Sequence, residues 1–196
     1  MSLVGARRAG AVALVALVAA LGTAAPARAA TAWVMDEARS RLVFTATQSG
    51  GEFDGRFQRF SADIAFDATD LAGSRFQVAI GTATADTGDP NRDSTLAGSD
   101  FFASDRWPTA TYQSRQFTAS AGGQFVARGT LTLRGVTRDV PLTFTFRPAA
   151  DGRSAVLAGG ATLRRLDFGV GQGQWEDTEW VGNDVRIRFE LVLHRK

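Results

Sequence analysis

A regular alternation of apolar and polar residues constrains the fold of this chain more than any other feature. In residues 185–193 the odd positions are apolar, and Arg186, Arg188 and Glu190 lie between them. A period of two turns one face of a strand toward an apolar interior and the other toward water. The pattern predicts eight strands, at residues 41–47, 60–66, 76–80, 109–117, 124–133, 140–146, 155–163 and 185–193.

The segments between these runs indicate antiparallel neighbours. Glycines suited to tight turns separate successive runs, among them Gly73, Gly135 and Gly152. No amphipathic stretch of helical length separates two runs, which argues against parallel strands. One short helix is expected near Asp93, whose side chain would cap it, and Pro141 indicates an edge or a bulge. The sequence pattern therefore predicts an all-β fold. We expect an eight-stranded antiparallel β-barrel with a short helix in a long inter-strand connection.

The first residues have the pattern of a secretory signal peptide. Arg7 and Arg8 precede an uninterrupted apolar run at 11–21, and an Ala27-Arg28-Ala29 cleavage site follows. We expect residues 1–29 to be removed and residues 30–196 to form one domain in the periplasm or outside the cell. Removal of the leader takes away three of the 22 Lys and Arg and none of the 20 acids, which leaves a net charge of −1. A nearly neutral chain has no electrostatic footprint for nucleic acid.

The scarcity of Cys and His narrows the chemistry. The chain has no Cys and a single His, His194. This composition excludes disulfides, thiolate zinc sites and Cys nucleophiles, and it leaves one candidate base for a hydrolase triad. His194 lies near the chain end on the polar side of its strand, where solvent exposure is the simplest interpretation. We predict no catalytic residue, no metal and no cofactor.

Two loops resemble known binding motifs only superficially. Residues 89–100 place oxygen side chains at the spacing of a calcium loop, but they lack its central Gly and its flanking helices. We interpret this loop as a connector that ion pairs of Arg92 hold in place. The glycines at 169–173 do not open a helix between parallel strands, so they are not a dinucleotide fingerprint. Trp175 and Trp180, which follow them, are predicted to cap one barrel end or gate its mouth.

The inward positions leave the nature of the interior open. They mix Phe with Ala and Gly, so they could interlock into a filled core or surround a tube that holds a ligand. The excess of Phe over Tyr fits a dry lining, because Phe has no hydroxyl that needs a partner. The candidate wall residues are Phe44, Ile64, Phe66, Val78, Ile80, Leu131, Leu142, Phe144, Leu157, Ile187, Phe189 and Leu191.

A family resemblance favours the tube. The order of several motifs, from about Trp33 to Leu193, resembles the YceI-like lipid/polyisoprenoid-binding family. This resemblance implies a lipocalin-like barrel, usually periplasmic and without catalysis, that holds a long isoprenoid in an elongated apolar cavity. Many members have a His where this chain has Gln48. The motifs are Gly55-Arg-Phe57, Phe60-x-x-x-Ile64-x-Phe66-Asp67, Asp86-Thr-Gly88, Arg92-Asp93-x-x-Leu96, Asp100-Phe101-Phe102, Trp107-Pro108-x-Ala110, Gly129-x-Leu131-Thr-Leu133-Arg-Gly135-Val136 and Arg165-x-Asp167-Phe168-Gly169.

We therefore expect an exported, non-catalytic protein that binds a polyisoprenoid, a quinone or a similar long-chain amphiphile, with the polar head at the barrel mouth. Residues 169–182 resemble a subgroup found near or fused to membrane b-type cytochromes, which implies a quinone ligand and such a cytochrome as candidate partner. A homodimer is a further candidate assembly. One alternative is a filled barrel that docks to a membrane redox partner through its Trp loop. Another is an enzyme acting on such a lipid, with Asp93 or Glu176 at the mouth.

Overall fold

The computed structural model describes residues 30–196, and the expected signal peptide lies outside these residues. The strands are β1 (Ala32–Met35), β2 (Arg41–Gln48), β3 (Gly51–Phe57), β4 (Phe60–Ala65), β5 (Arg75–Gly81), β6 (Ala85–Asp86), β7 (Thr109–Ala119), β8 (Gln124–Leu133), β9 (Val136–Pro148), β10 (Ser154–Arg164) and β11 (Asp184–Arg195). The helices are α1 (Pro90–Ala97) and the 3₁₀ turns η1 (Thr82–Thr84), η2 (Ala121–Gly123), η3 (Arg165–Phe168) and η4 (Gly173–Glu176). None of the helices within residues 30–196 has the length and apolar character needed to cross a membrane.

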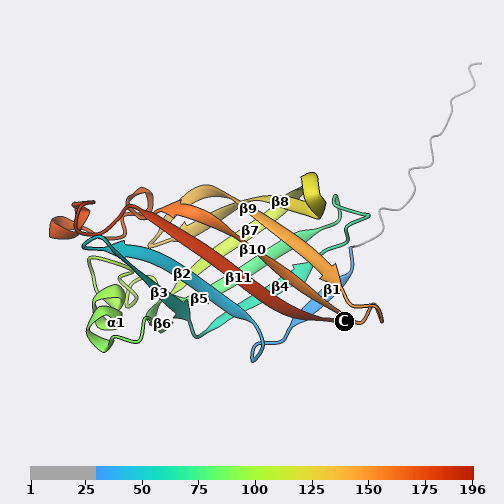
Figure 1. The fold of residues 1–196 in the computed structure, drawn as a ribbon, viewed down its shortest axis with the longest axis horizontal. Helices are drawn as coiled ribbons and strands as arrows, with labels where there is room; N and C mark the ends of the chain where they lie inside the picture. Colours follow the sequence, from blue (N-terminus) through green and yellow to red (C-terminus); the bar gives the residue numbers. More distant parts are fainter. Residues whose placement is uncertain (1–29) are drawn as a thin grey trace, which may run out of the picture.

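The strands close into the predicted barrel (Figure 1). The antiparallel order β1-β4-β5-β7-β8-β9-β10-β11 returns to its start through pairing of β1 with β11. Strand β2 also pairs with β11, further along the same strand, and β3 pairs with β2. Strands β1 and β2 thus form one interrupted stave, by which we mean one of the eight strand positions around the barrel. Strands β3 and β4 form the next stave. The prediction of an eight-stranded antiparallel barrel is confirmed.

The pattern missed strands β1, β3 and β6. Strand β6 has two residues, β1 has four, and β3 includes Gly51 and Gly55, so none of them presents a long apolar alternation. Proline 141 was expected at an edge or a bulge. It lies in β9, but the ladder between β9 and β10 begins only at Thr143, so Pro141 occupies a segment without a partner on that side. A proline there removes no hydrogen bond of that ladder.

The short helix lies in the expected connection but has a different cap. Helix α1 begins at Pro90, and the Asp89 carboxylate accepts hydrogen bonds from the backbone N–H groups of Asn91 and Arg92. The prediction that Asp93 caps the helix is wrong, because its carboxylate instead accepts from the N–H and hydroxyl of Thr87. Asp followed by Pro at the first helical position is the stronger start signal.

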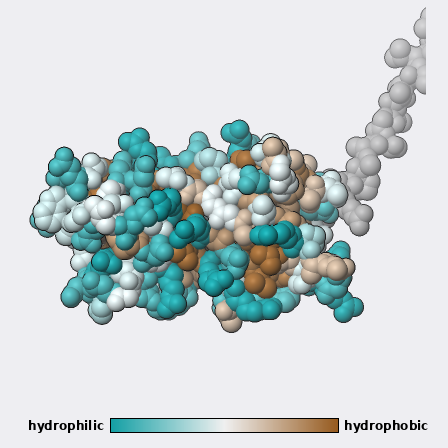
Figure 2. All heavy atoms as spheres, in the orientation of Figure 1, coloured by the Kyte–Doolittle hydropathy of each residue, from teal (hydrophilic) through white to brown (hydrophobic). Residues whose placement is uncertain are grey.

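The two faces of the sheet differ as the alternation requires. On β2 and β11, Phe44 and Ile187 are directly paired and face the interior. The outward residues of β2, β3 and β11 form ion pairs between these strands, and Figure 2 shows hydrophilic residues over much of the visible outer face. The pairs are Arg186–Glu52 at 2.7 Å, Arg41–Glu190 at 2.8 Å and Arg188–Asp54 at 3.3 Å.

The interior divides into two halves along the barrel axis. One half, at the end near β1 and the C-terminus, is a packed aromatic cluster around Phe66 and Phe144. The other half lies toward α1 and η4, where a looser set of apolar residues includes Phe44, Leu96 and Phe101. The cavity that concerns function lies mainly in this second half.

Candidate ligand-binding site

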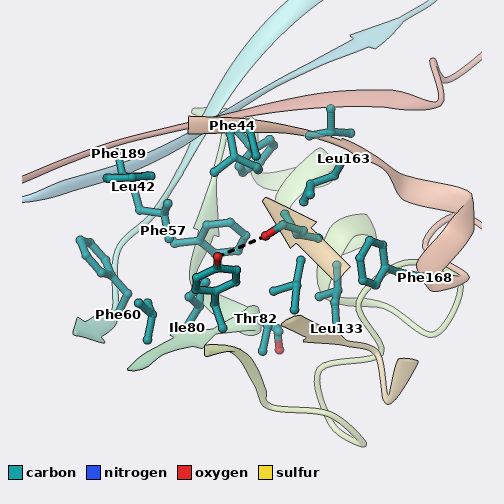
Figure 3. A pocket seen from close by; sticks show the side chains of 18 of the residues that line it. Leu42, Phe44, Phe57, Phe60, Ile80, Thr82, Leu133, Leu163, Phe168 and Phe189 are labelled. Atoms are coloured by element: carbon teal, nitrogen blue, oxygen red, sulfur yellow. Dashed lines mark hydrogen bonds between the residues drawn. The ribbon is translucent and has the colours of Figure 1, made fainter. Parts of the chain in front are cut away.

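A cavity of about 190 Å³ lies inside the barrel. Side chains from opposite staves point into a common space, as Figure 3 shows for Phe44, Phe57, Phe60, Leu163 and Phe168. Inward positions of β2, β4, β5, β7, β8, β10 and β11 supply most of the wall. A volume of this size is large enough for several water molecules, but a wall so apolar favours hydrocarbon.

Among residues 30–196, three polar residues line this cavity, and the structure shows partners for each of them. The Thr82 hydroxyl donates to the carbonyl of Trp107 at 2.8 Å, and the Tyr112 hydroxyl donates to the carbonyl of Val140 at 3.1 Å. The Arg165 guanidinium donates to the carbonyls of Val170, Gly171, Val181 and Gly182. These groups are directed into the protein's own backbone, so the wall is suited to an apolar chain.

Burial changes the acid–base behaviour of two of these groups. Desolvation raises the pKa of Tyr112 to about 12, so its phenol stays neutral at physiological pH. Desolvation lowers the pKa of Arg165 from its usual value, against the opposing effect of Glu176. Arg165 nonetheless stays charged, because guanidinium is protonated far above neutral pH.

Ten of the twelve predicted wall residues line the cavity. They come from seven of the eight staves, which shows that the alternation identified the inward faces. They are Phe44, Ile64, Val78, Ile80, Leu131, Leu142, Leu157, Ile187, Phe189 and Leu191.

Phe66 and Phe144, the other two predicted wall residues, do not line the cavity. Both are fully buried in the aromatic cluster, with their ring centroids 5.2 Å apart. Phe66 also contacts Phe76, Phe117 and Phe146. The aromatic cluster fills the end of the barrel near β1, and the hollow part of the interior lies between this cluster and α1. Periodicity gives the direction of a side chain but not its depth along the bore.

Part of the wall was not predicted from the sequence. Strand β3 contributes Phe53 and Phe57, and the connection that contains α1 contributes Leu96, Phe101 and Phe102. The apolar Phe101-Phe102 pair in an otherwise polar connection was the available signal, since exposed loops seldom carry two adjacent aromatic residues. These residues cover the end of the barrel at α1.

Beside the cavity lies an outer pocket of about 240 Å³, which we call the vestibule. Phe53, Leu96, Phe101 and Val181 line both spaces, so the cavity and the vestibule share a wall. The other residues of the vestibule are mostly polar. They are Gln48, Asp89, Asn91, Arg92, Thr95 and Trp175.

The two tryptophans of the η4 loop have different positions. Trp175 lines the vestibule, not the cavity, and its ring centroid lies 5.4 Å from that of Phe101. Trp180 lines neither space and is 62% exposed, so its prediction as a binding residue has no support in this geometry. Its backbone carbonyl accepts from Ser49, which holds the loop beside the tip of the β2–β3 hairpin.

The calcium-like loop has no arrangement suited to a cation. Asp89 caps α1 and Asp93 binds Thr87, so these carboxylates serve the local backbone. Among residues 30–196 no group of three or more His, Cys, Asp or Glu could hold a metal. The expected ion pairs of Arg92 reduce to one contact with Asp89 at 4.0 Å, so they do not hold the connector.

The sequence that forms this barrel matches a known domain family. The model of the YceI-like domain matches residues 33–193. The chain belongs to the YceI-like family. This YceI-like protein is 30% identical over 120 residues to a UPF0312 protein of Vibrio cholerae, a match that covers 59% of this chain and 64% of that protein, less than two thirds of its length.

Solved structures share the fold of this YceI-like protein. Burkholderia cenocepacia BcnA is 32% identical, with a TM-score of 0.76, and the match covers 81% of this chain and 98% of BcnA. A polyisoprenoid binding domain from Saccharophagus degradans, implicated in plant cell wall breakdown, has a TM-score of 0.63 at 16% identity, covering 85% of this chain and 99% of that one. At that identity the likeness to the second structure concerns the fold alone.

Proposed function

We propose that this YceI-like protein is an exported, non-catalytic binding protein that holds a polyisoprenoid, a quinone or a similar long-chain amphiphile in its barrel. One observation carries the proposal: the cavity wall is apolar, and its three polar residues bond to the protein's own backbone. The leader-like pattern of residues 1–29 supports export. The polyisoprenoid binding domain of the same fold supports the ligand class.

The energetics of an apolar tail suit such a wall. Each CH₂ group moved from water into an apolar site contributes about 0.8 kcal/mol, so a tail of a few isoprene units needs no hydrogen bond inside the cavity. The tail would enter past the residues that the cavity shares with the vestibule, with the aromatic cluster as the end of its path. A polar head would then stay in the vestibule.

The enzyme alternative has less support. The Asp93 carboxylate is occupied by Thr87, and Glu176 is exposed on the η4 loop without an ion pair among the described residues. The Asp93–Thr87 pair and Glu176 line neither the cavity nor the vestibule, so these groups lie away from the proposed lipid site. A b-type cytochrome partner stays a prediction from the family resemblance, and a homodimer stays a candidate assembly.

The proposal is tested by mass spectrometry of an organic extract from protein exported under its own leader. We expect a prenyl-chain lipid in amounts near that of the protein. Ala161 lines the cavity, so Ala161→Phe should fill part of it and lower the bound lipid at least about 10-fold, equivalent to ~1.4 kcal/mol.

The control uses the same strand and the same substitution. Ala158 does not line the cavity and alternates with Leu157, which does, so Ala158→Phe should leave binding unchanged. Protein that carries no lipid, and that binds no prenyl compound after delipidation and titration, would refute the proposed function.

A further inference from the structure

The guanidinium of Arg92 has no hydrogen-bond partner in the part of the chain that the structure describes. Its Nε is buried and makes no hydrogen bond. Its nearest carboxylate oxygen, on Asp89, lies 4.0 Å from a terminal guanidinium nitrogen. The side chain is 28% exposed, and its guanidinium carbon lies 4.2 Å from the centre of the Phe53 ring. The group is thus held in place by stacking, while its donors are not used by the protein.

Other arginines at this end of the barrel differ from Arg92. Arg165 donates to four backbone carbonyls. Arg134 donates to the carbonyls of Ser99 and Phe101 and to the Gln172 side chain. The hydrogen bonds of Arg165 and Arg134 thus give each of these side chains a structural role, which is to stabilise the loops that they contact. Arg92 makes no such hydrogen bond to a loop. A partly buried charged donor without an acceptor is unfavourable unless another molecule supplies one.

The location of Arg92 suggests where the acceptor comes from. Arg92 lines the vestibule, and Phe53, on which it stacks, lines both the vestibule and the apolar cavity. The guanidinium therefore lies at the boundary between an apolar space and a polar one. An amphiphile with its tail in the cavity would bring its head to this boundary.

The surroundings of Arg92 indicate the charge and shape of that head. Asp89 also lines the vestibule, so the formal charges of these two side chains cancel, which disfavours a highly charged anion such as a diphosphate. Phe53, Phe101 and Trp175 supply aromatic faces, and flat rings stack well on such faces. The amide of Gln48 adds a neutral donor and acceptor.

We propose that Arg92 binds the ligand head: its guanidinium donates hydrogen bonds to the acceptor oxygens of an uncharged, planar head group in the vestibule. The inference rests on the proposed function for the tail, and it adds the site and the chemistry of the head. Arg92 is therefore a ligand-binding residue, not a fastener of its connector.

The test compares three probes whose branched tails are alike in length but whose heads differ. Menaquinone-4 has a planar head with carbonyl oxygens, geranylgeranyl diphosphate has an anionic head, and phytane has no head. Each is titrated into delipidated protein by displacement of a fluorescent fatty-acid probe. The wild-type protein should bind menaquinone-4 more tightly than either of the others.

Substitution of Arg92 should weaken the probe with the uncharged head and spare the probe that has no head. Arg92→Gln should weaken menaquinone-4 about 10- to 100-fold, the range for a hydrogen bond from a charged donor, and leave phytane within about twofold. Arg92→Lys, which keeps the charge, should recover part of the loss. Arg106 is the matched control, because it lies 4.5 Å over the ring of Trp107 but lines neither space. Arg106→Gln should change no affinity.

Three results would overturn the inference. Equal weakening of menaquinone-4 and phytane by Arg92→Gln would mean that the substitution only disturbs the cavity. Tighter wild-type binding of the diphosphate than of menaquinone-4 would refute an uncharged head. Unchanged menaquinone-4 affinity in a folded Arg92→Gln protein, checked by circular dichroism, would refute a role for Arg92. Failure of all three probes to bind the wild type would instead refute the proposed function itself.

Discussion

The ring of Phe44 occupies the space that a side chain at residue 55 would need, because Gly55 is its direct partner across β2 and β3. A Cβ built on Gly55 would overlap the outer edge of that ring. The ring also lines the cavity, so the free space beside it lies on the ligand side. The size of the side chain at residue 55 therefore determines how far the Phe44 ring extends into the cavity.

Gly55→Ala should push the Phe44 ring toward the cavity. We expect a loss of about 1–3 kcal/mol in the free energy of unfolding, the usual cost of overpacking, and weaker binding of prenyl ligands. Urea denaturation and the displacement titration measure the two effects. Gly51→Ala is the control on the same strand, because its Cβ would make only an ordinary contact at 3.6 Å. Equal effects of the two substitutions would contradict this account.

Phe144 closes the bore, so its truncation should both destabilise the protein and lengthen the cavity. Phe144→Ala should lower the free energy of unfolding by about 3–5 kcal/mol, as for other large aromatic core residues. If the variant remains folded, its preference should shift toward prenyl alcohols with longer tails, as titration of a chain-length series would show. Val34→Ala, at an exposed position on β1, should change stability by less than about 0.5 kcal/mol. A preference that does not move would mean that the cluster does not limit tail length.

The pKa of Tyr112 should be about two units higher in the folded protein than in the unfolded one. The chain has a single Tyr, so tyrosinate absorbance reports this residue alone. Burial raises its pKa from 10.0 to about 12. The stability linked to the neutral phenol is therefore fully present below pH 10 and is lost as the pH rises toward 12, a change of about 3 kcal/mol at 1.4 kcal/mol per unit. Tyrosinate absorbance near pH 10 in protein that circular dichroism shows to be folded would contradict this prediction.

Arg165 should fasten the loop that carries Trp175. Arg165→Lys replaces a fork that reaches four carbonyls with a single ammonium, so we expect a loss of about 2–4 kcal/mol in the free energy of unfolding. Trp fluorescence in urea follows the change. The neighbouring Arg164 is exposed, and Arg164→Lys should have almost no effect. A similar loss for both variants would show that the carbonyl contacts contribute little.

The alternation predicted the barrel because it is a local property of each strand. Residues 185–191 alternate strictly, and the structure places Ile187, Phe189 and Leu191 in the cavity wall. Strand β3 escaped prediction because Gly51 and Gly55 interrupt its apolar positions, although Phe53 and Phe57 face the cavity. A glycine that makes room for Phe44 is recognisable only once its partner across the sheet is known.

By itself the sequence determined an eight-stranded antiparallel barrel and which face of most strands lies inside, because the direction of a side chain depends only on the period of its own strand. Only the tertiary structure decided how far the interior is hollow, since this depends on the register between strands that are distant in sequence. That register places Phe66 and Phe144 together in the closed half. The tertiary structure also places Arg92 of α1 on Phe53 without an acceptor, because hydrogen-bond partners are fixed by distances that a linear pattern does not contain.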